Sequence, residues 1–380
     1  MYPEPSEPIR ALTRAIHEAG YGQALTPDFE LRKHTSFQIG GPADLYFDPP
    51  SIEALSMALA SANEVGVPVT VLGGGTNILV SDAGVRGLVV HLGKAFEYIR
   101  DLGEGEEWRD IPDDAATPGL AAPAPGPPPG QGSSIAAAKS AQPAGPATRH
   151  ATEGAAMRRV LVRYVDVESG ASTRFIRLAK ETVSRGLEGL QFAAGIPGSV
   201  GGAAQMNAGA FGGEISDCLT SMTMVMASGE IVEKKREELE FSYRKLALPP
   251  GTMIASVRFR LLRSSVGKLQ QVVARVQEKR RRHQPAGYPN AGSIFKNPPG
   301  EFAGRLIEKA GLKGLTEGSA QVSPDHANFI INLGGATAAD VRSLMSRVQE
   351  EVWKRCGVWL EPEVRLVGEW GHNEVAAAGS

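Results

Sequence analysis

The sequence predicts an α+β fold, and two observations lead to this prediction. Apolar or alternating runs typical of β-strands recur along the chain, and three of them follow one another between residues 219 and 262. Amphipathic segments with the period of an α-helix occur elsewhere, for example at 338–352. A mixture of strand runs and separate helices is typical of α+β proteins.

The first hundred residues predict two helices and a strand. Residues 9–19 have the apolar spacing of a short amphipathic helix. Ser51 is a suitable N-cap for a second helix that ends near Gly66, because a serine oxygen accepts hydrogen bonds from the free amides of a first turn. The β-branched residues at 68–72 then predict a strand.

The remaining elements follow from the same patterns. Thr337 and Asp340 have the spacing of a capping box at the start of the last helix. Further strands are predicted at 160–167, 221–226, 229–232, 254–262 and 329–332, and further helices at 173–185, 268–282 and 302–310.

An insert with a different composition interrupts this pattern from about 104 to 157. Most residues from 111 to 150 are Pro, Ala or Gly, which cannot bury a core, and we therefore expect disorder there. A surface insertion of this length is tolerated because the entropy of loop closure grows slowly with length. A lid over a ligand is the alternative interpretation.

The bulk properties restrict the class of protein. A chain of 380 residues (40.2 kDa) can hold two or three domains with a substantial core. The net charge of −2 argues against a nucleic-acid or anionic-membrane partner. The basic run 279–283 ends a predicted helix, where the helix dipole favours positive charge; attraction of a diphosphate substrate is a second interpretation.

Cysteine usage and the lack of long apolar runs add further expectations. Cys218 and Cys356 are too few for a disulfide framework and lie in no metal-binding pattern, so we expect no metal site. We find neither a signal peptide nor an apolar run long enough to span a membrane. We therefore expect a cytoplasmic protein, and the sequence indicates no obligate protein partner.

Two glycine-rich segments are candidates for a phosphate-binding or cofactor-binding site. In the first, the strand at 68–72 leads into three glycines, Gly73 to Gly75, followed by Thr76 and Asn77. Consecutive glycines let the main chain approach an anion and aim amide hydrogens at it. The spacing fits neither a Walker loop nor a Rossmann fingerprint, and a tight hairpin is the alternative interpretation.

The second segment, 186–214, is rich in glycine but also contains core-type residues such as Leu190 and Phe192. This composition excludes a flexible linker and indicates close backbone packing around a flat or phosphorylated group.

The peptide 290–298 (Asn-Ala-Gly-Ser-Ile-Phe-Lys-Asn-Pro) contains a serine with several donors nearby. Ser293 follows Gly292, and Lys296 and Asn297 come shortly after. No second glycine brackets the serine as in a nucleophile elbow, so it suits a proton donor or oxyanion partner better than an acyl nucleophile. Taken alone, the peptide could also be a polar turn.

Together these segments resemble, in the same order, the UDP-N-acetylenolpyruvoylglucosamine reductase family, the MurB flavoenzymes of peptidoglycan synthesis. The resemblance covers about residues 25–98 and 160–370. The motifs that carry it are 34–44 (His-Thr-Ser-Phe-Gln-Ile-Gly-Gly-Pro-Ala-Asp), 73–77, 195–214, 241–244 (Phe-Ser-Tyr-Arg), 291–298 and 360–365 (Leu-Glu-Pro-Glu-Val-Arg).

The resemblance implies a domain organisation. A two-subdomain FAD-binding region of the PCMH/VAO type (25–265) is expected to enclose the flavin, followed by an α/β substrate-binding domain (266–370). Residues 1–24 would form an N-terminal helical extension and 371–380 a flexible tail. The short segment after Arg244 indicates the subclass that lacks an extra tyrosine-bearing lid loop.

The resemblance also implies a reaction. NADPH would reduce FAD, and the enolpyruvyl ether of UDP-N-acetylglucosamine would then be reduced to UDP-N-acetylmuramate. Hydride addition leaves negative charge on the adjacent carbon and the carboxylate, so the site needs cations and a proton donor. By position in the motifs, Ser293 resembles the proton donor, Arg244 the arginine that binds the carboxylate, and Glu363 the acid that stabilises the enolate-like intermediate.

The other site residues are assigned in the same way. Tyr243, Lys296 and Asn297 are expected to contact the substrate. Because neither cysteine lies in a flavin-binding motif, FAD is expected to be noncovalent. The expected cofactor-binding residues are Gly73, Gly74, Gly75, Thr76, Asn77, Gly195, Gly198, Ser199, Gly201, Gly202 and Asn207.

One departure and two rival functions accompany this assignment. Leu246 stands where the family often has serine. A related FAD-dependent sugar or lactone oxidoreductase on the same scaffold is the main rival, although the peptide 290–298 and Glu363 argue against it. A non-catalytic FAD-binding protein is the third interpretation.

Overall fold

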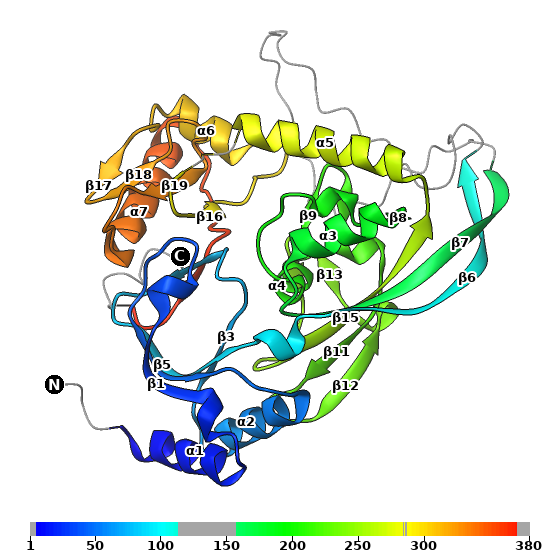
Figure 1. Ribbon diagram of the computed structural model, residues 1–380. Helices are drawn as coiled ribbons and strands as arrows, with labels where there is room; N and C mark the ends of the chain where they lie inside the picture. The colour runs from blue at the N-terminus through cyan, green and yellow to red at the C-terminus, as the bar shows by residue number, and fades with distance from the viewer. Residues whose placement is uncertain (1–4, 113–156, 284, 286, 371–380) are drawn as a thin grey trace.

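The computed structural model describes residues 5–112, 157–283, 285 and 287–370. An N-terminal sheet with two helices lies at the base of the molecule in Figure 1, a larger sheet lies beside it, and a C-terminal domain lies above the first sheet.

The N-terminal sheet has the strand order β1-β2-β5-β3. Its elements are α1 (Glu7–Glu18), β1 (Leu25–Glu30), β2 (Pro42–Phe47), α2 (Ile52–Glu64), β3 (Val69–Leu72) and β5 (Val85–His91). The predicted helices and strand are confirmed, and Ser51 caps α2 by accepting a hydrogen bond from the Ala54 amide at 3.2 Å. Leu12 and Ile16 of α1 are fully buried in the same core as α2, so this helix belongs to the domain.

The second sheet has the order β12-β11-β15-β7-β6, with β8 paired to β15. Its strands are β6 (Ile99–Pro112), β7 (Met157–Gly170), β8 (Leu187–Glu188), β11 (Leu219–Val225), β12 (Ile231–Lys235) and β15 (Met253–Arg263). The helices near it are α3 (Phe175–Ser184), α4 (Val200–Gln205) and α5 (Val266–His283). The predicted strands and helices of this region are confirmed, with ends shifted by a few residues.

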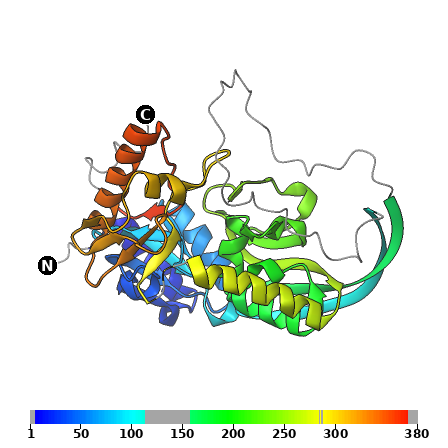
Figure 2. The same ribbon diagram turned by 90° about the horizontal axis from the view of Figure 1, so that it is seen from above.

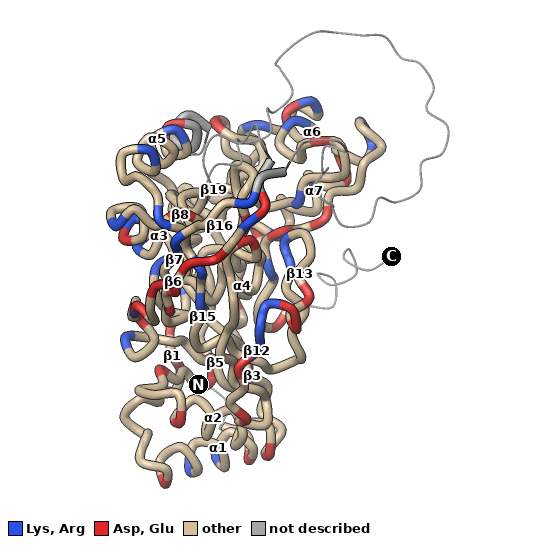
Figure 3. Tube along the Cα trace, turned by 90° about the vertical axis from the view of Figure 1, so that its right-hand side faces the viewer, with Lys and Arg blue, Asp and Glu red and all other residues tan. Residues whose placement is uncertain are grey.

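The long hairpin of β6 and β7 corrects the predicted limits of the insert. We expected the insert to begin at about 104, but β6 stays paired with β7 as far as Pro112, opposite Met157. The hairpin curves away from the body of the protein in Figure 2. Cross-strand ion pairs, such as Glu106 to Arg163 at 2.9 Å, stabilise it, and charges of both signs mark the strands in Figure 3. Glu and Gly are poor strand formers, so composition alone misplaced the boundary.

The C-terminal domain contains the sheet β16-β19-β18-β17 with α6 and α7. Its elements are β16 (Asn290–Ser293), α6 (Ala303–Lys309), β17 (Thr316–Glu317), β18 (Ala320–Val322), β19 (Phe329–Asn332) and α7 (Ala338–Cys356). The predicted strand at 329–332 is confirmed, as is the capping box of Thr337 and Asp340.

Two connections join the C-terminal domain to the N-terminal part. Strand β20 (Arg365–Val367) pairs in parallel with β4 (Ile78–Val80), the strand that follows the glycine triplet. Phe37 and Ile39, which precede β2, pack in the core of the C-terminal domain. The predicted boundary after residue 265 therefore does not separate two independent cores.

Two negative observations hold for the residues that the structure describes. None of their helices is both long and apolar enough to cross a bilayer. No group of three or more His, Cys, Asp or Glu side chains among them is arranged to hold a metal ion.

The hairpin geometry predicts that residues 113–156, which lie outside the described residues, can be replaced. Pro112 and Met157 are direct register partners, so a two-residue Asn-Gly turn in place of 113–156 should close β6 onto β7. We expect the variant to keep its Tm within a few degrees, and the flavin content and turnover that the family resemblance implies should stay within a few-fold of the parent. Thermal unfolding and steady-state turnover measure this, and a folded variant with most of its turnover lost would give 113–156 a role in the reaction.

Candidate active site

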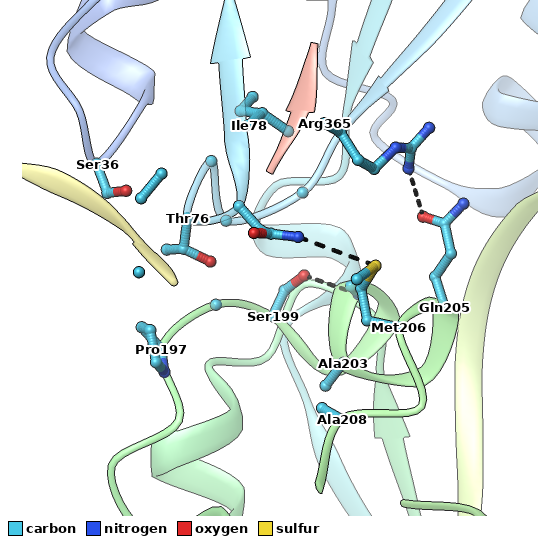
Figure 4. A pocket seen from close by; sticks show the side chains of 18 of the residues that line it. Ser36, Thr76, Ile78, Pro197, Ser199, Ala203, Gln205, Met206, Ala208 and Arg365 are labelled. Atoms are coloured by element: carbon cyan, nitrogen blue, oxygen red, sulfur yellow. Dashed lines mark hydrogen bonds between the residues drawn. The ribbon is translucent and has the colours of Figure 1, made fainter. Parts of the chain in front are cut away.

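A cavity of about 540 Å³ lies where the loop between β3 and β4, the segment around α4 and the C-terminal domain meet. Figure 4 shows part of its lining. The sequence-predicted residues that line it are Gly73, Gly74, Gly75, Thr76, Asn77, Gly198, Ser199, Gly201, Gly202, Arg244, Ser293 and Glu363. Five stretches that are distant in the sequence therefore form one site.

Close contact between the two glycine segments forms one wall of the cavity. A Cβ atom on Gly74 would lie 2.8 Å from the Gly198 Cα, and one on Gly198 would lie 2.8 Å from the Thr76 Oγ1. Gly75 and Gly198 also have φ angles of +63° and +104°, which L side chains rarely adopt. The triplet is not a tight hairpin, because β3 pairs with β5 whereas β4 pairs with β20. Main-chain atoms therefore form this wall.

Helix α4 continues the wall. Ser199 caps it, with Oγ accepting a hydrogen bond from the Gly202 amide at 3.3 Å (Figure 4). A Cβ atom on Gly201 would lie 2.9 Å from the Ala171 Cβ, so glycine lets the helix approach the end of β7. Gly201, Gly202 and Ala203 of this helix line the cavity, and their small size leaves the cavity volume open.

Asn77 links the glycine triplet to the segment that carries Glu363. Its Nδ2 donates to the Glu363 carbonyl at 3.1 Å, and its own carbonyl accepts from the Arg365 amide at 3.1 Å. These bonds begin the pairing of β4 with β20. The expected cofactor loop and an expected catalytic residue are thus held in one backbone network.

Ser293 ends strand β16 and lines the cavity. Gly292 before it has a φ of +77°, and its amide donates to the Asn290 Oδ1 at 3.0 Å. The Asn290 carbonyl accepts from the Ser36 Oγ at 2.6 Å, which ties the strand to the N-terminal part. The glycine therefore permits the bend that places the serine, and the asparagine fixes it.

Glu363 lies beside this strand. Its amide donates to the Ile294 carbonyl at 2.7 Å, so the acid and Ser293 belong to adjacent backbone segments. The Glu363 side chain is only 14% exposed. Burial raises the pKa of its carboxyl, and the charges of Arg244 and Lys296 oppose this increase only in part.

Arg244 occupies a strained turn at the tip of a small hairpin. The hairpin consists of β13 (Phe241–Ser242) and β14 (Lys245–Leu246), and Arg244 has a φ of +57°. This conformation costs a non-glycine residue about 1–3 kcal/mol, and such strain clusters at functional sites. Its Nε lies 3.3 Å from the Glu363 Oε1, and its Nη1 donates to the Gly209 carbonyl at 3.3 Å. The guanidinium and the Glu363 carboxyl are thus close together but not aligned for a hydrogen bond.

Three expected substrate-binding residues do not line the cavity. Lys296 bonds to Glu361 at 3.0 Å, and the Asn297 Oδ1 accepts from the Ala303 amide at the start of α6. Tyr243 is 61% exposed on the hairpin tip. Lys296 follows Ser293 with the spacing of a Ser-x-x-Lys pair, but its ammonium is held by Glu361 outside the lining.

Two expected cofactor-binding residues are also absent from the lining. Gly195 directly precedes the lining residue Ile196. Its φ of +102° is a backbone conformation that favours glycine. Asn207 is buried, and its Nδ2 donates to the Ser242 carbonyl at 3.3 Å, so it anchors the hairpin of Arg244. The flavin contacts of these two residues stay predictions.

Several lining residues were not selected from the sequence. Ser36 and Arg365 lie in motifs that we quoted, but nothing local distinguished them from neighbouring polar residues. Arg365 reaches the Gln205 Oε1 at 3.3 Å, as Figure 4 shows. Tyr288 and His91 also line the cavity, and burial lowers the pKa of His91.

Comparison with known proteins identifies the family. Residues 284–367 match the model of the C-terminal domain of UDP-N-acetylenolpyruvoylglucosamine reductase, and residues 43–111 and 155–234 match an FAD-binding domain model. The UDP-N-acetylenolpyruvoylglucosamine reductase of Agathobacter rectalis is 38% identical over 363 residues, covering 95% of this chain and 98% of the relative. The chain belongs to the UDP-N-acetylenolpyruvoylglucosamine reductase (MurB) family.

Further relatives agree with this family. The enzyme of the same name from Rubrobacter xylanophilus is 40% identical to this MurB chain over 90% of the chain and 95% of the relative. The crystal structure of MurB from Thermus caldophilus superposes with a TM-score of 0.64 and 32% identity, covering 89% of this chain and 97% of that one. The predicted family and FAD-binding fold are confirmed.

The cavity fits FAD. The two matched stretches of the FAD-binding domain contain both glycine segments. In the structure these segments form a glycine-rich wall with much exposed main chain, which lets a pyrophosphate approach main-chain amides.

This fit predicts the effect of a side chain at Gly74. Gly74→Val should push the two loops apart, because its Cβ would meet the Gly198 backbone. We expect the folded variant to contain less than about a tenth of the wild-type amount of flavin per protein molecule. The absorbance of the purified, folded protein measures this ratio. Gly267→Ala in α5 is the control, since its Cβ would meet only the Ser265 Oγ at 4.0 Å, and it should keep full flavin content. Full flavin content in folded Gly74→Val would remove the loop from the cofactor site.

Proposed function

We propose that this MurB protein reduces UDP-N-acetyl-3-O-(1-carboxyvinyl)-glucosamine to UDP-N-acetylmuramate with noncovalent FAD and NADPH. The observation that carries the proposal is the convergence of Ser293, Arg244 and Glu363 on the cavity walled by the glycine loops. The glycine loops around Gly74 and Gly198 would hold the flavin, which would supply the chemistry of hydride transfer between NADPH and the vinyl carbon. A nucleotide-sugar substrate and NADPH place the reaction in the cytoplasm.

Each of the three residues has a separate role. Arg244 holds the substrate carboxylate, since a guanidinium pairs with a carboxylate in a planar, bidentate fashion. Ser293 donates a proton from Oγ to the carbon next to the one that receives hydride. Glu363, whose pKa burial raises, keeps a proton more readily and donates a hydrogen bond where negative charge accumulates on the substrate.

The glycine loops and Asn77 hold the cofactor and catalytic groups together. Gly74 and Gly198 shape the cofactor wall, while Asn77 connects it to Glu363. A related oxidase on the same scaffold would not require this arrangement, and the comparisons with reductases of 38% and 40% identity favour the reductase.

Ser293→Ala should separate the two half-reactions. We expect anaerobic reduction of the flavin by NADPH to stay within about two-fold, because Ser293 acts only after hydride has left the flavin. Reoxidation by the enolpyruvyl substrate should slow by about 10²–10⁴-fold, the usual contribution of a positioned general acid. Stopped-flow absorbance measures both steps, and a slowed NADPH step alone would contradict the proton-donor role.

Arg244→Ala should affect binding as well as chemistry. The substrate carboxylate is charged before and after hydride transfer, so we expect KM to rise by about 10-fold or more and kcat to fall. Steady-state kinetics with the enolpyruvyl substrate measure this. An unchanged KM would exclude the carboxylate contact.

Glu363→Gln should change the pH dependence of the second half-reaction. If the protonated acid acts, the wild-type rate must fall as pH rises through the raised pKa of Glu363, because the proton is then lost. The glutamine variant has no proton to lose at this position. It should be slower at low pH but lack this fall, and an unchanged alkaline fall would contradict the role.

A further inference from the structure

We infer that Asn328 is a positioning residue that sets the placement of Ser293 and Glu363 through the main chain of Phe295. Asn328 is not among the residues that line the cavity, and its side chain is bonded to the Phe295 main chain instead. The inference rests on the proposed function, because its effect is expected in the step that uses these two residues.

Asn328 holds one edge of the segment that follows Ser293. Its Oδ1 accepts a hydrogen bond from the Phe295 amide at 3.0 Å, and its Nδ2 donates to the Phe295 carbonyl at 2.8 Å. Its own carbonyl accepts from the Ile294 amide at 2.9 Å. One side chain thus makes the two hydrogen bonds that a neighbouring strand residue would otherwise make.

The opposite edge of the same segment carries Glu363. The Ile294 carbonyl accepts from the amides of Glu363 at 2.7 Å and Val364 at 3.3 Å. The Lys296 amide donates to the Glu361 carbonyl at 2.9 Å, and Phe295 forms a bridge with Pro362. A shift of this segment would therefore displace Ser293, which directly precedes it in the chain, and Glu363, which is hydrogen-bonded to it.

The site requires both a donor and an acceptor in one short side chain. Asn328 and Phe295 are 4% and 1% exposed, so water cannot replace a lost hydrogen bond. The Asn328 amide also donates to the His326 Nδ1 at 3.1 Å, which fixes the turn before β19. An aspartate would fit the space but would place an acceptor against the Phe295 carbonyl.

The role of Asn328 is tested with Asn328→Asp and Asn328→Ala in the flavin-loaded full chain. We expect unchanged flavin content and NADPH reduction within two-fold of wild type, whereas reoxidation by the enolpyruvyl substrate slows by about 10²-fold, as expected for a misplaced catalytic group. The alanine variant, which only removes the amide, serves if the aspartate variant does not fold.

A stability control distinguishes positioning from general destabilisation. Leu344→Ala removes a fully buried side chain from α7 in the same core and should lower Tm without slowing reoxidation more than a few-fold. If both Asn328 variants are reoxidised at the wild-type rate, or if Leu344→Ala is slowed equally, the inference about Asn328 is wrong. The proposed function is not affected by either result. Failure of wild-type protein to be reoxidised by this substrate would overturn the proposed function, and the inference with it.

Discussion

The close approach of two glycine loops is the constraint on which the rest of the site depends. Gly74 and Gly198 meet backbone to backbone, with no room for a Cβ atom between them. This contact joins the N-terminal sheet to the region of α4 and leaves main-chain atoms facing the cavity. Any side chain here would separate the two loops and remove the main-chain surface that we propose for the pyrophosphate.

The segments of the proposed catalytic residues Glu363 and Ser293 are attached to this wall by backbone hydrogen bonds. Asn77 and the pairing of β4 with β20 attach the segment of Glu363 to the glycine triplet. The Ile294 carbonyl then attaches the segment of Ser293 to Glu363. Arg244 comes from a separate hairpin, where its φ is positive, and its Nε lies 3.3 Å from the Glu363 Oε1. Direct contacts therefore connect the glycine triplet to Glu363, and Glu363 to the segment of Ser293 and to Arg244.

Much of the fold and the three proposed catalytic residues could be predicted from the sequence. The helix starts at Ser51 and Thr337 depend on local hydrogen bonds, which a sequence pattern reveals. Ser293, Arg244 and Glu363 could be selected because each lies in a recognisable family motif.

Other features depended on contacts between distant segments. Asn297 and Asn207 look like ligand contacts, but the fold turns their amides toward the backbone of α6 and of Ser242. Asn328 looked unremarkable because its partner, Phe295, is far away in the sequence. The end of β6 was missed because its strand pairing comes from β7, on the other side of the insert.

The central claim is that this cavity transfers hydride from NADPH to an enolpyruvyl ether. The most direct measurement is an anaerobic titration of flavin-loaded wild-type protein, first with NADPH and then with one equivalent of the UDP-linked substrate, followed by mass spectrometry. We predict that the flavin absorbance disappears with NADPH and returns with the substrate, and that the product is heavier by two hydrogens. A reduced flavin that ignores the substrate and is reoxidised only by oxygen would contradict the account and indicate an oxidase.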